Sequence, residues 1–195
     1  MIETGNPALL VIDVQQAIDH FSPYPRSNPE AEQRIAALLN DWRSLERPVI
    51  HIRHSSRFAE SPYHADGSHF EFKAEVAPID EEIVVTKREN CAFIGTELDS
   101  TLKRMQITEL VIAGVVTNHS VDATTRIGAA LGYRILLPED ATAAFAMPLR
   151  NGTLIAAEKV QQVFLHNLDG EYAHVCHSRD LLSGNGPNTT SETHQ

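Results

Sequence analysis

The chain has 195 residues, which fits one single-core domain better than two. Its 42% hydrophobic and 22% charged residues argue against a disordered or fibrous protein, and its formal charge of −10 without a basic run argues against a nucleic-acid partner. No basic signal-peptide region and no apolar run near the roughly 20 residues of a membrane span occur. We therefore expect a cytoplasmic protein without a membrane partner.

Short apolar runs alternate with helical periodicity along the chain. The run 8–12, Ala-Leu-Leu-Val-Ile, is apolar on both faces and stops at Asp13, which predicts a strand buried between two helical layers. The tripeptide Asn-Pro-Glu at 28–30 predicts a capped helix start, followed by an apolar face that includes Leu45. Further strands are predicted at 48–53, 83–86, 110–115, 134–137 and 172–176, and further helices at 96–105, 121–131 and 153–166, the last with Leu154 and Val163 on its apolar face.

This alternation predicts an α/β fold: a single doubly wound, mostly parallel six-stranded sheet with helices on both faces. Residues 1–182 would form the domain, and 183–195, which lack apolar periodicity, are expected to form a mobile tail. The segment 55–78 reads as a long loop, and loops of this length are usually functional covers or disordered.

Polar residues follow several of the predicted strands. In a doubly wound sheet, ligands bind beyond the carboxyl ends of the strands, where the winding reverses. Asp13, His54, Lys87 and the segment 117–120, Thr-Asn-His-Ser, lie at such ends. A carboxylate, an ammonium and a hydroxyl are therefore predicted to converge.

Three ordered motifs at these ends resemble the isochorismatase-like hydrolases. They are Val-Ile-Asp-Val-Gln at 11–15, Lys87 with Asn-Cys-Ala-Phe at 90–93, and Gly-Val-Val-Thr-Asn-His-Ser-Val at 114–121. The resemblance extends over about residues 8–182. It implies hydrolysis of a C–N bond in a small-molecule amide or ureide, and assembly as a homodimer or homotetramer.

The resemblance also implies roles for individual residues. In amide-cleaving members a cysteine attacks the carbonyl, an aspartate relays its proton and a lysine stabilises the charged forms. In this sequence Ser120 stands at the cysteine position, Asp13 at the aspartate position and Lys87 at the lysine position. It implies a cis peptide between Val115 and Val116, with the amides of Val116 and Ser120 as the oxyanion hole. Phe21, His54, Asn90 and His119 are the expected substrate-binding residues.

Ser120 departs from the family pattern, because a hydroxyl is a far poorer nucleophile than a thiol. Three interpretations stay open: an engineered Cys-to-Ser replacement, a natural serine with an acyl-serine route or lost activity, or a vinyl-ether hydrolase of the isochorismatase type that uses Asp13 as proton donor. A catalytically silent small-molecule binding protein is the non-enzyme alternative. Cys91 is interpreted as a small buried residue and not as the nucleophile.

Neither a metal nor an organic cofactor is expected. Nicotinamidases of the family bind metal through an Asp-x-His pair with further histidines, and the sequence His-Ile-Arg-His at 51–54 has no such aspartate. No glycine-rich phosphate loop follows the first predicted strand. The aromatic residues of 55–78, Tyr63 among them, are expected either to wall the pocket or to contact another subunit.

Overall fold

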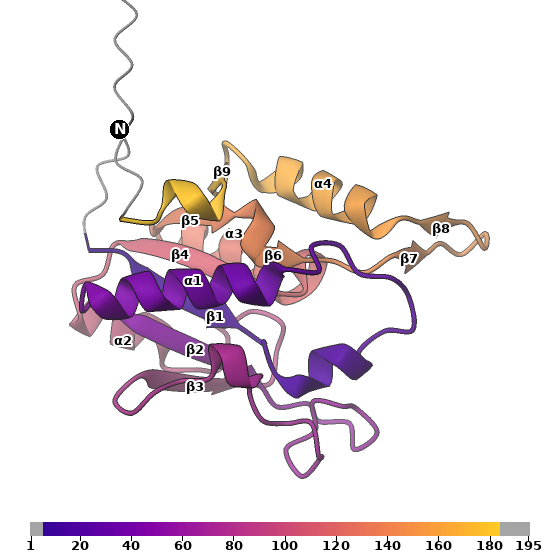
Figure 1. Cartoon of the computed structure of the whole chain (residues 1–195), viewed down its shortest axis with the longest axis horizontal. Coiled ribbons are helices and arrows are strands. Elements are labelled where there is room, and N and C mark those ends of the chain that lie inside the picture. The colour runs from indigo at the N-terminus through magenta and orange to yellow at the C-terminus, as the bar shows by residue number, and fades with distance from the viewer. Residues whose placement is uncertain (1–5, 184–195) are drawn as a thin grey trace, which may run out of the picture.

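A parallel sheet forms the centre of the protein in the computed structural model, which describes residues 6–183. Six parallel strands follow the order β3-β2-β1-β4-β5-β9 (Figure 1). They are β1 (Ala8–Ile12), β2 (Val49–His54), β3 (Ile83–Lys87), β4 (Glu109–Val115), β5 (Arg134–Pro138) and β9 (His174–Cys176). The short strand β6 (Thr142–Ala143) pairs with the end of β4 as a seventh member of the sheet. The predicted fold class is thus confirmed, with β6 added.

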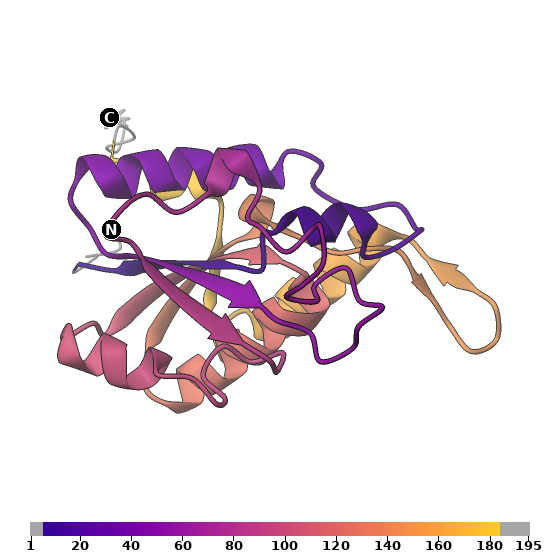
Figure 2. The ribbon, with the colours of Figure 1, turned by 90° about the horizontal axis from the view of Figure 1, so that it is seen from below.

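Helices cover both faces of this sheet. The helix α1 (Ala31–Ser44) lies on one face, and α2 (Leu98–Arg104) and α3 (Asp122–Ala130) lie on the other, where α4 (Ala157–Leu168) joins them (Figure 2). Two apolar clusters fill the layers, one under α1 and one under α2, α3 and α4. Among residues 6–183, no helix combines the length and apolar character that crossing a membrane requires.

The winding of the sheet reverses between β1 and β4. From β1 the chain adds β2 and β3 on one side, and β4, β5 and β9 on the other. Gly114 allows β4 to pass close to β1, because its φ is +126° and a Cβ there would lie 2.2 Å from the carbonyl oxygen of Ile12. This close approach lies at the carboxyl end of β4, beside the predicted site.

Most predicted boundaries agree with the structure to within two residues, but the predicted cap of α1 is wrong. Glu30, not Asn28, precedes the helix, and no side chain caps it. Asn28 has φ +44°, and its side-chain amide donates to the carbonyl oxygens of Glu139 and Thr142, both at 2.7 Å. Leu45, predicted on the apolar face, follows the helix and is 41% exposed. Asn28 therefore joins α1 to the end of β5 instead of capping the helix.

The prediction of a helix from residue 153 is wrong at its start. Residues 147–155 form an antiparallel hairpin of β7 (Met147–Pro148) and β8 (Leu154–Ile155), which projects from the body of the molecule (Figure 2). Leu154 and Val163, predicted to be buried, are 49% and 52% exposed. The pairing within the hairpin takes up residues 154 and 155 before α4 begins. The predicted tail lies, apart from Ser183, outside the described residues.

A partly buried polar cluster fastens α1 to the sheet. Glu82 accepts hydrogen bonds from Arg43 Nε at 2.8 Å and from His51 Nε2 at 2.9 Å. Burial lowers the pKa of His51, and its Nδ1 is buried without a hydrogen-bond partner. The neutral ring with its proton on Nε2 fits this environment, because a proton on Nδ1 would have no acceptor.

Candidate active site

The three side chains predicted to be catalytic meet at the carboxyl edge of the sheet. Asp13 follows β1, Lys87 is the last residue of β3, and Ser120 lies in the turn after β4. Lys87 Nζ is 2.7 Å from Asp13 Oδ2 and 3.1 Å from Ser120 Oγ. The convergence expected from the strand ends is therefore present in the structure.

The ammonium group of Lys87 organises this centre. Lys87 is only 1% exposed, and besides Asp13 and Ser120 its Nζ lies 3.1 Å from the carbonyl oxygen of Glu89 and 3.4 Å from His54 Nδ1. An ammonium has three N–H donors, and the three shortest contacts account for them. The charge of Lys87 is thus buried but fully hydrogen-bonded, with Asp13 as its counter-charge.

The carboxylate of Asp13 has one oxygen engaged and one without a partner. Oδ2 accepts from Lys87, whereas Oδ1 is buried and has no hydrogen bond. The backbone holds the residue in place at φ +57°: the amide of Asp13 donates to the carbonyl of Ile52, and the carbonyl of Asp13 accepts from the Tyr63 hydroxyl at 3.3 Å. Oδ1 is consequently the carboxylate oxygen that is left to accept a hydrogen bond.

The turn that carries Ser120 has an unusual backbone. The peptide between Val115 and Val116 is cis, which confirms the sequence-based prediction. Residues Thr117–Val121 form a π-helical turn, and the carbonyl of Val116 accepts from the amides of His119 and Val121. The turn runs directly into α3, so Ser120 lies near the amino end of a helical segment, where backbone N–H groups favour negative charge.

A small cavity of about 100 Å³ opens beside Asp13 and Ser120. All the predicted substrate-binding and oxyanion residues line it, together with three residues not assigned to it from the sequence motifs. Its lining consists of Asp13, Phe21, His54, Ser61, Tyr63, Asn90, Val115, Val116, His119 and Ser120. The structure places these residues together, whereas their contributions to binding stay predictions.

Aromatic rings form one wall of the cavity. Phe21 makes edge contacts with His119 at 5.9 Å and with Tyr63 at 6.3 Å between ring centroids, and the rings of Tyr63 and His54 are 5.6 Å apart. Burial lowers the pKa of both His54 and His119, and the Lys87 charge adds to this effect at His54. Both imidazoles are therefore neutral near pH 7. The loop residue Phe58, in contrast, is 68% exposed and lies away from the cavity lining.

Gln15 is a positioning residue for which the sequence analysis gave no role. Its side chain is fully buried and hydrogen-bonds to backbone groups, as a neighbouring strand would. Oε1 accepts from the amide of His54 at 2.8 Å, and Nε2 donates to the carbonyls of His54 and Phe70. Backbone hydrogen bonds also join residues 14–17 to 69–73. The long loop 55–78 is therefore tied to the end of β1.

Cys91 is buried in the apolar cluster under α2, α3 and α4. Burial raises the pKa of its thiol, and Cys91 is not among the residues that line the cavity. Both observations agree with the interpretation of Cys91 as a packing residue. Among residues 6–183, no group of three or more His, Cys, Asp and Glu side chains is arranged to hold a metal ion.

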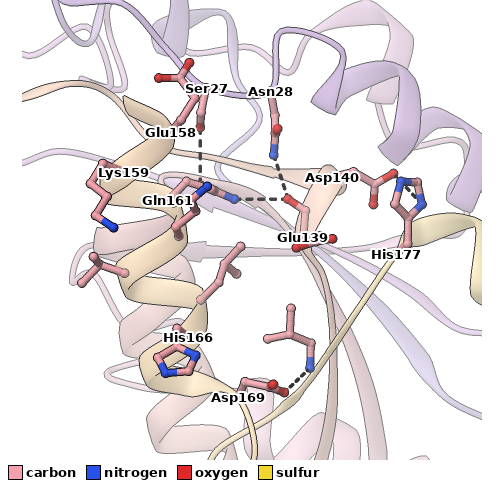
Figure 3. Close-up of a pocket in the computed structure, with 14 residues that line it drawn as sticks. Ser27, Asn28, Glu139, Asp140, Glu158, Lys159, Gln161, His166, Asp169 and His177 are labelled. Carbon is pink, nitrogen blue, oxygen red and sulfur yellow. Dashed lines mark hydrogen bonds and ion pairs between the residues drawn. The ribbon is translucent and has the colours of Figure 1, made fainter. Parts of the chain in front are cut away.

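A second, larger cleft of about 730 Å³ lies between α4 and the loops after β5 and β9 (Figure 3). Its labelled polar residues include Ser27, Asn28, Glu139 and Gln161. None of the residues of the Asp13 cavity contributes to this cleft. The two hollows are separate.

The comparisons with known proteins agree on one family. The isochorismatase domain model matches residues 7–179. The uncharacterized isochorismatase family protein YrdC of Bacillus subtilis is 39% identical, over 90% of this chain and 94% of that protein. A crystal structure of an isochorismatase-family protein from Chromobacterium violaceum has a TM-score of 0.89 at 43% identity and covers 95% of this chain and 97% of its own.

Two further relatives have names that state an activity. A streptothricin hydrolase of Streptomyces noursei is 35% identical over 72% of this chain, which spans 51% of that enzyme. Nicotinamidase 3 of Arabidopsis thaliana is 28% identical over 76% of this chain and 78% of its own length.

Proposed function

Because this chain belongs to the isochorismatase family, we propose that it is an amidohydrolase for a C–N bond in a small amide, ureide or related compound. The observation that carries the proposal is the buried Lys87 ammonium, which bridges Asp13 Oδ2 and Ser120 Oγ and leaves Oδ1 of Asp13, a residue of the cavity lining, without a partner. This geometry combines a proton acceptor, a nucleophile position and a fixed positive charge. The relatives named as a streptothricin hydrolase and a nicotinamidase support the reaction class.

Asp13 serves as the proton carrier in this proposal. Its Oδ1 takes the proton of the group at position 120, whose heteroatom bonds to the substrate carbonyl carbon while the C=O electron pair moves to oxygen. As the C–N bond breaks, Asp13 gives the proton to the leaving nitrogen. Water then attacks the acyl intermediate and transfers a proton through Asp13 to the group at position 120, which leaves and is restored.

The remaining groups stabilise charge during these steps. Lys87, 3.1 Å from Ser120 Oγ, offsets negative charge on the attacking atom. The amides of Val116 and Ser120 serve as the oxyanion donors, since both residues line the cavity at the start of a helical segment. A serine at position 120 makes this chain a weak catalyst, because a single carboxylate is a poor base for a hydroxyl.

The size of the cavity limits the substrate to small molecules. Its volume of about 100 Å³ is well below the about 300–1,000 Å³ of pockets for drug-sized ligands. The neutral rings of His54 and His119 and the aromatic wall favour an uncharged, compact acyl group.

The test compares ammonia release from a panel of small amides and ureides by this chain and by Ser120→Cys. We expect a gain of at least about 100-fold with the thiol on at least one substrate, because the thiol is more acidic and more nucleophilic. Asp13→Asn in the Ser120→Cys background is the matched control and should abolish the gain while leaving the thiol in place. No hydrolysis by either the serine or the cysteine form would refute the proposal.

Ser120 itself favours one second candidate, a vinyl-ether hydrolase with Asp13 as proton donor, since that chemistry needs no thiol. Consumption of isochorismate by the unmodified chain, undiminished in Ser120→Ala and lost in Asp13→Asn, would select this reaction over C–N cleavage. Tight binding of small amides without turnover by the cysteine form would instead indicate a binding protein.

A further inference from the structure

Gln161 is a buried polar residue of α4 that is hydrogen-bonded to the π-helical turn Thr117–Val121, called here the nucleophile turn because it carries Ser120. It is 5% exposed, and Figure 3 shows its side chain directed toward Ser27 and Glu139 at the wall of the larger cleft. Gln161 is absent from the lining of the Asp13 cavity. Any influence of this residue on the reaction must therefore pass through the groups to which it is hydrogen-bonded.

The oxygen of the Gln161 amide holds the nucleophile turn. Oε1 accepts a hydrogen bond of 2.6 Å from the hydroxyl of Thr117, the first residue of the π-helical turn. Thr117 is fully buried and follows Val116 directly, three positions before Ser120. The hydrogen bond thus fixes the segment between the two amides assigned to the oxyanion hole.

The nitrogen of the same amide is held by the sheet. Nε2 donates to the hydroxyl of Thr142 at 2.8 Å and lies 3.1 Å from the carbonyl oxygen of Glu139. This pattern determines which way the amide points, because a flipped Gln161 would set its oxygen against carbonyl acceptors. The side chain therefore links β6, a fixed part of the sheet, to the turn after β4.

We propose that Gln161 is a positioning residue for the oxyanion donors: through Thr117 it fixes the turn that presents the amides of Val116 and Ser120. The inference rests on the proposed hydrolysis and adds a residue outside the cavity to its machinery. A purely structural role would fasten α4 to the sheet and leave the turn unaffected. The two roles differ in what they predict for kcat and for motion of the turn.

The kinetic test uses the Ser120→Cys form as parent. Gln161→Leu should lower kcat by about 10- to 100-fold with KM changed less than about 3-fold, because loosened oxyanion donors affect the transition state more than substrate binding. Thr117→Val should reproduce this loss, and Thr117→Ser, which keeps the hydroxyl, should restore most of the activity. Val160→Ala is the control, since Val160 is a buried α4 residue whose truncation loosens the helix without removing the hydrogen bond.

A second measurement does not depend on turnover. Amide hydrogen exchange of residues 115–122 should become at least about 10-fold faster in Gln161→Leu and stay near the parent rate in Val160→Ala. If the parent hydrolyses nothing, the proposed function fails, and the exchange result still decides whether Gln161 holds the turn. An active parent whose kcat and exchange are unchanged by Gln161→Leu, or changed equally by Val160→Ala, would overturn the inference.

Discussion

Replacing Lys87 with methionine should destabilise the protein more than removal of any surface cation. The change removes the donors to Asp13 Oδ2, Ser120 Oγ and the Glu89 carbonyl, and since Asp13 Oδ1 has no partner, neither carboxylate oxygen would then be hydrogen-bonded. Breaking one side of a buried ion pair costs about 3–5 kcal/mol. This is a large part of the about 5–15 kcal/mol that stabilises a typical domain.

The loss in free energy of unfolding comes from leaving the Asp13 carboxylate without its counter-charge and not from lost packing. Adding Asp13→Asn to Lys87→Met should therefore recover about 2 kcal/mol, because a neutral amide is cheaper to bury than an unpaired carboxylate. The free energies of unfolding of the single and the double variant are measured by urea unfolding. The signal is the fluorescence of Trp42, the single tryptophan, which is 1% exposed in α1.

Lys103→Met is the matched control for this experiment. Lys103 pairs with Asp99 at 2.7 Å, but its side chain is 63% exposed, and such helical surface pairs contribute at most about 0.5 kcal/mol. A Lys87→Met variant within about 1 kcal/mol of the parent, or a double variant less stable than the single one, would refute the view of Lys87 as the buried counter-charge of Asp13.

Three further outcomes are expected. Burial lowers the pKa of His51 below its ordinary 6.5, so the unfolded chain binds more protons than the folded one at acidic pH. The contribution of His51 to the free energy of unfolding should therefore be fully present above about pH 6.5 and decrease as the pH drops. His51→Asn should flatten this pH dependence in urea unfolding. Gly114→Ala should cost about 3 kcal/mol or more, since its Cβ would meet backbone at 2.2 Å, whereas Gly95→Ala, with nothing within 4 Å, should cost about 1–2 kcal/mol; equal losses would contradict the steric explanation. Light scattering should give a homodimer or homotetramer, and charged substitutions at Leu149 and Leu154, exposed on and beside the projecting hairpin, should dissociate it; an unaltered mass would exclude this surface from the interface.

The sheet and the edge that carries the candidate site were predictable because their signals are local. The apolar run before Asp13 and the one that ends at Val115 predict buried strands, and parallel strands bring their carboxyl ends to one edge. Topology places Asp13, Lys87 and Ser120 on one edge of the sheet, and the Lys87 ammonium, which reaches past β2, brings the three side chains together. The cis peptide before Val116 was predicted from resemblance, since nothing in the composition of two valines indicates it.

The parts that could not be predicted depend on long-range partners. Gln15 and Gln161 are ordinary polar residues in the sequence, and their roles come from acceptors and donors far along the chain, such as Phe70 and Thr117. Asn28 carried a sequence signal for a helix cap, but the carbonyl of Glu139 offered its amide a partner more than a hundred residues away. Local propensity yields in such cases to tertiary hydrogen bonding.

The anchoring of the long loop by Gln15 fixes one side of the cavity to the sheet. Residues 69–73 are hydrogen-bonded to the end of β1 and the Tyr63 hydroxyl donates to the carbonyl of Asp13, so Tyr63 is tied to the sheet, whereas Phe21, which also lines the cavity, is 41% exposed. Rotations of exposed side chains take picoseconds to nanoseconds, much faster than the opening of a lid. For the proposed hydrolysis we therefore expect the Tyr63 side of the cavity to keep its shape, so that a changed substrate preference calls for exchanged lining side chains and not for a loop of different length.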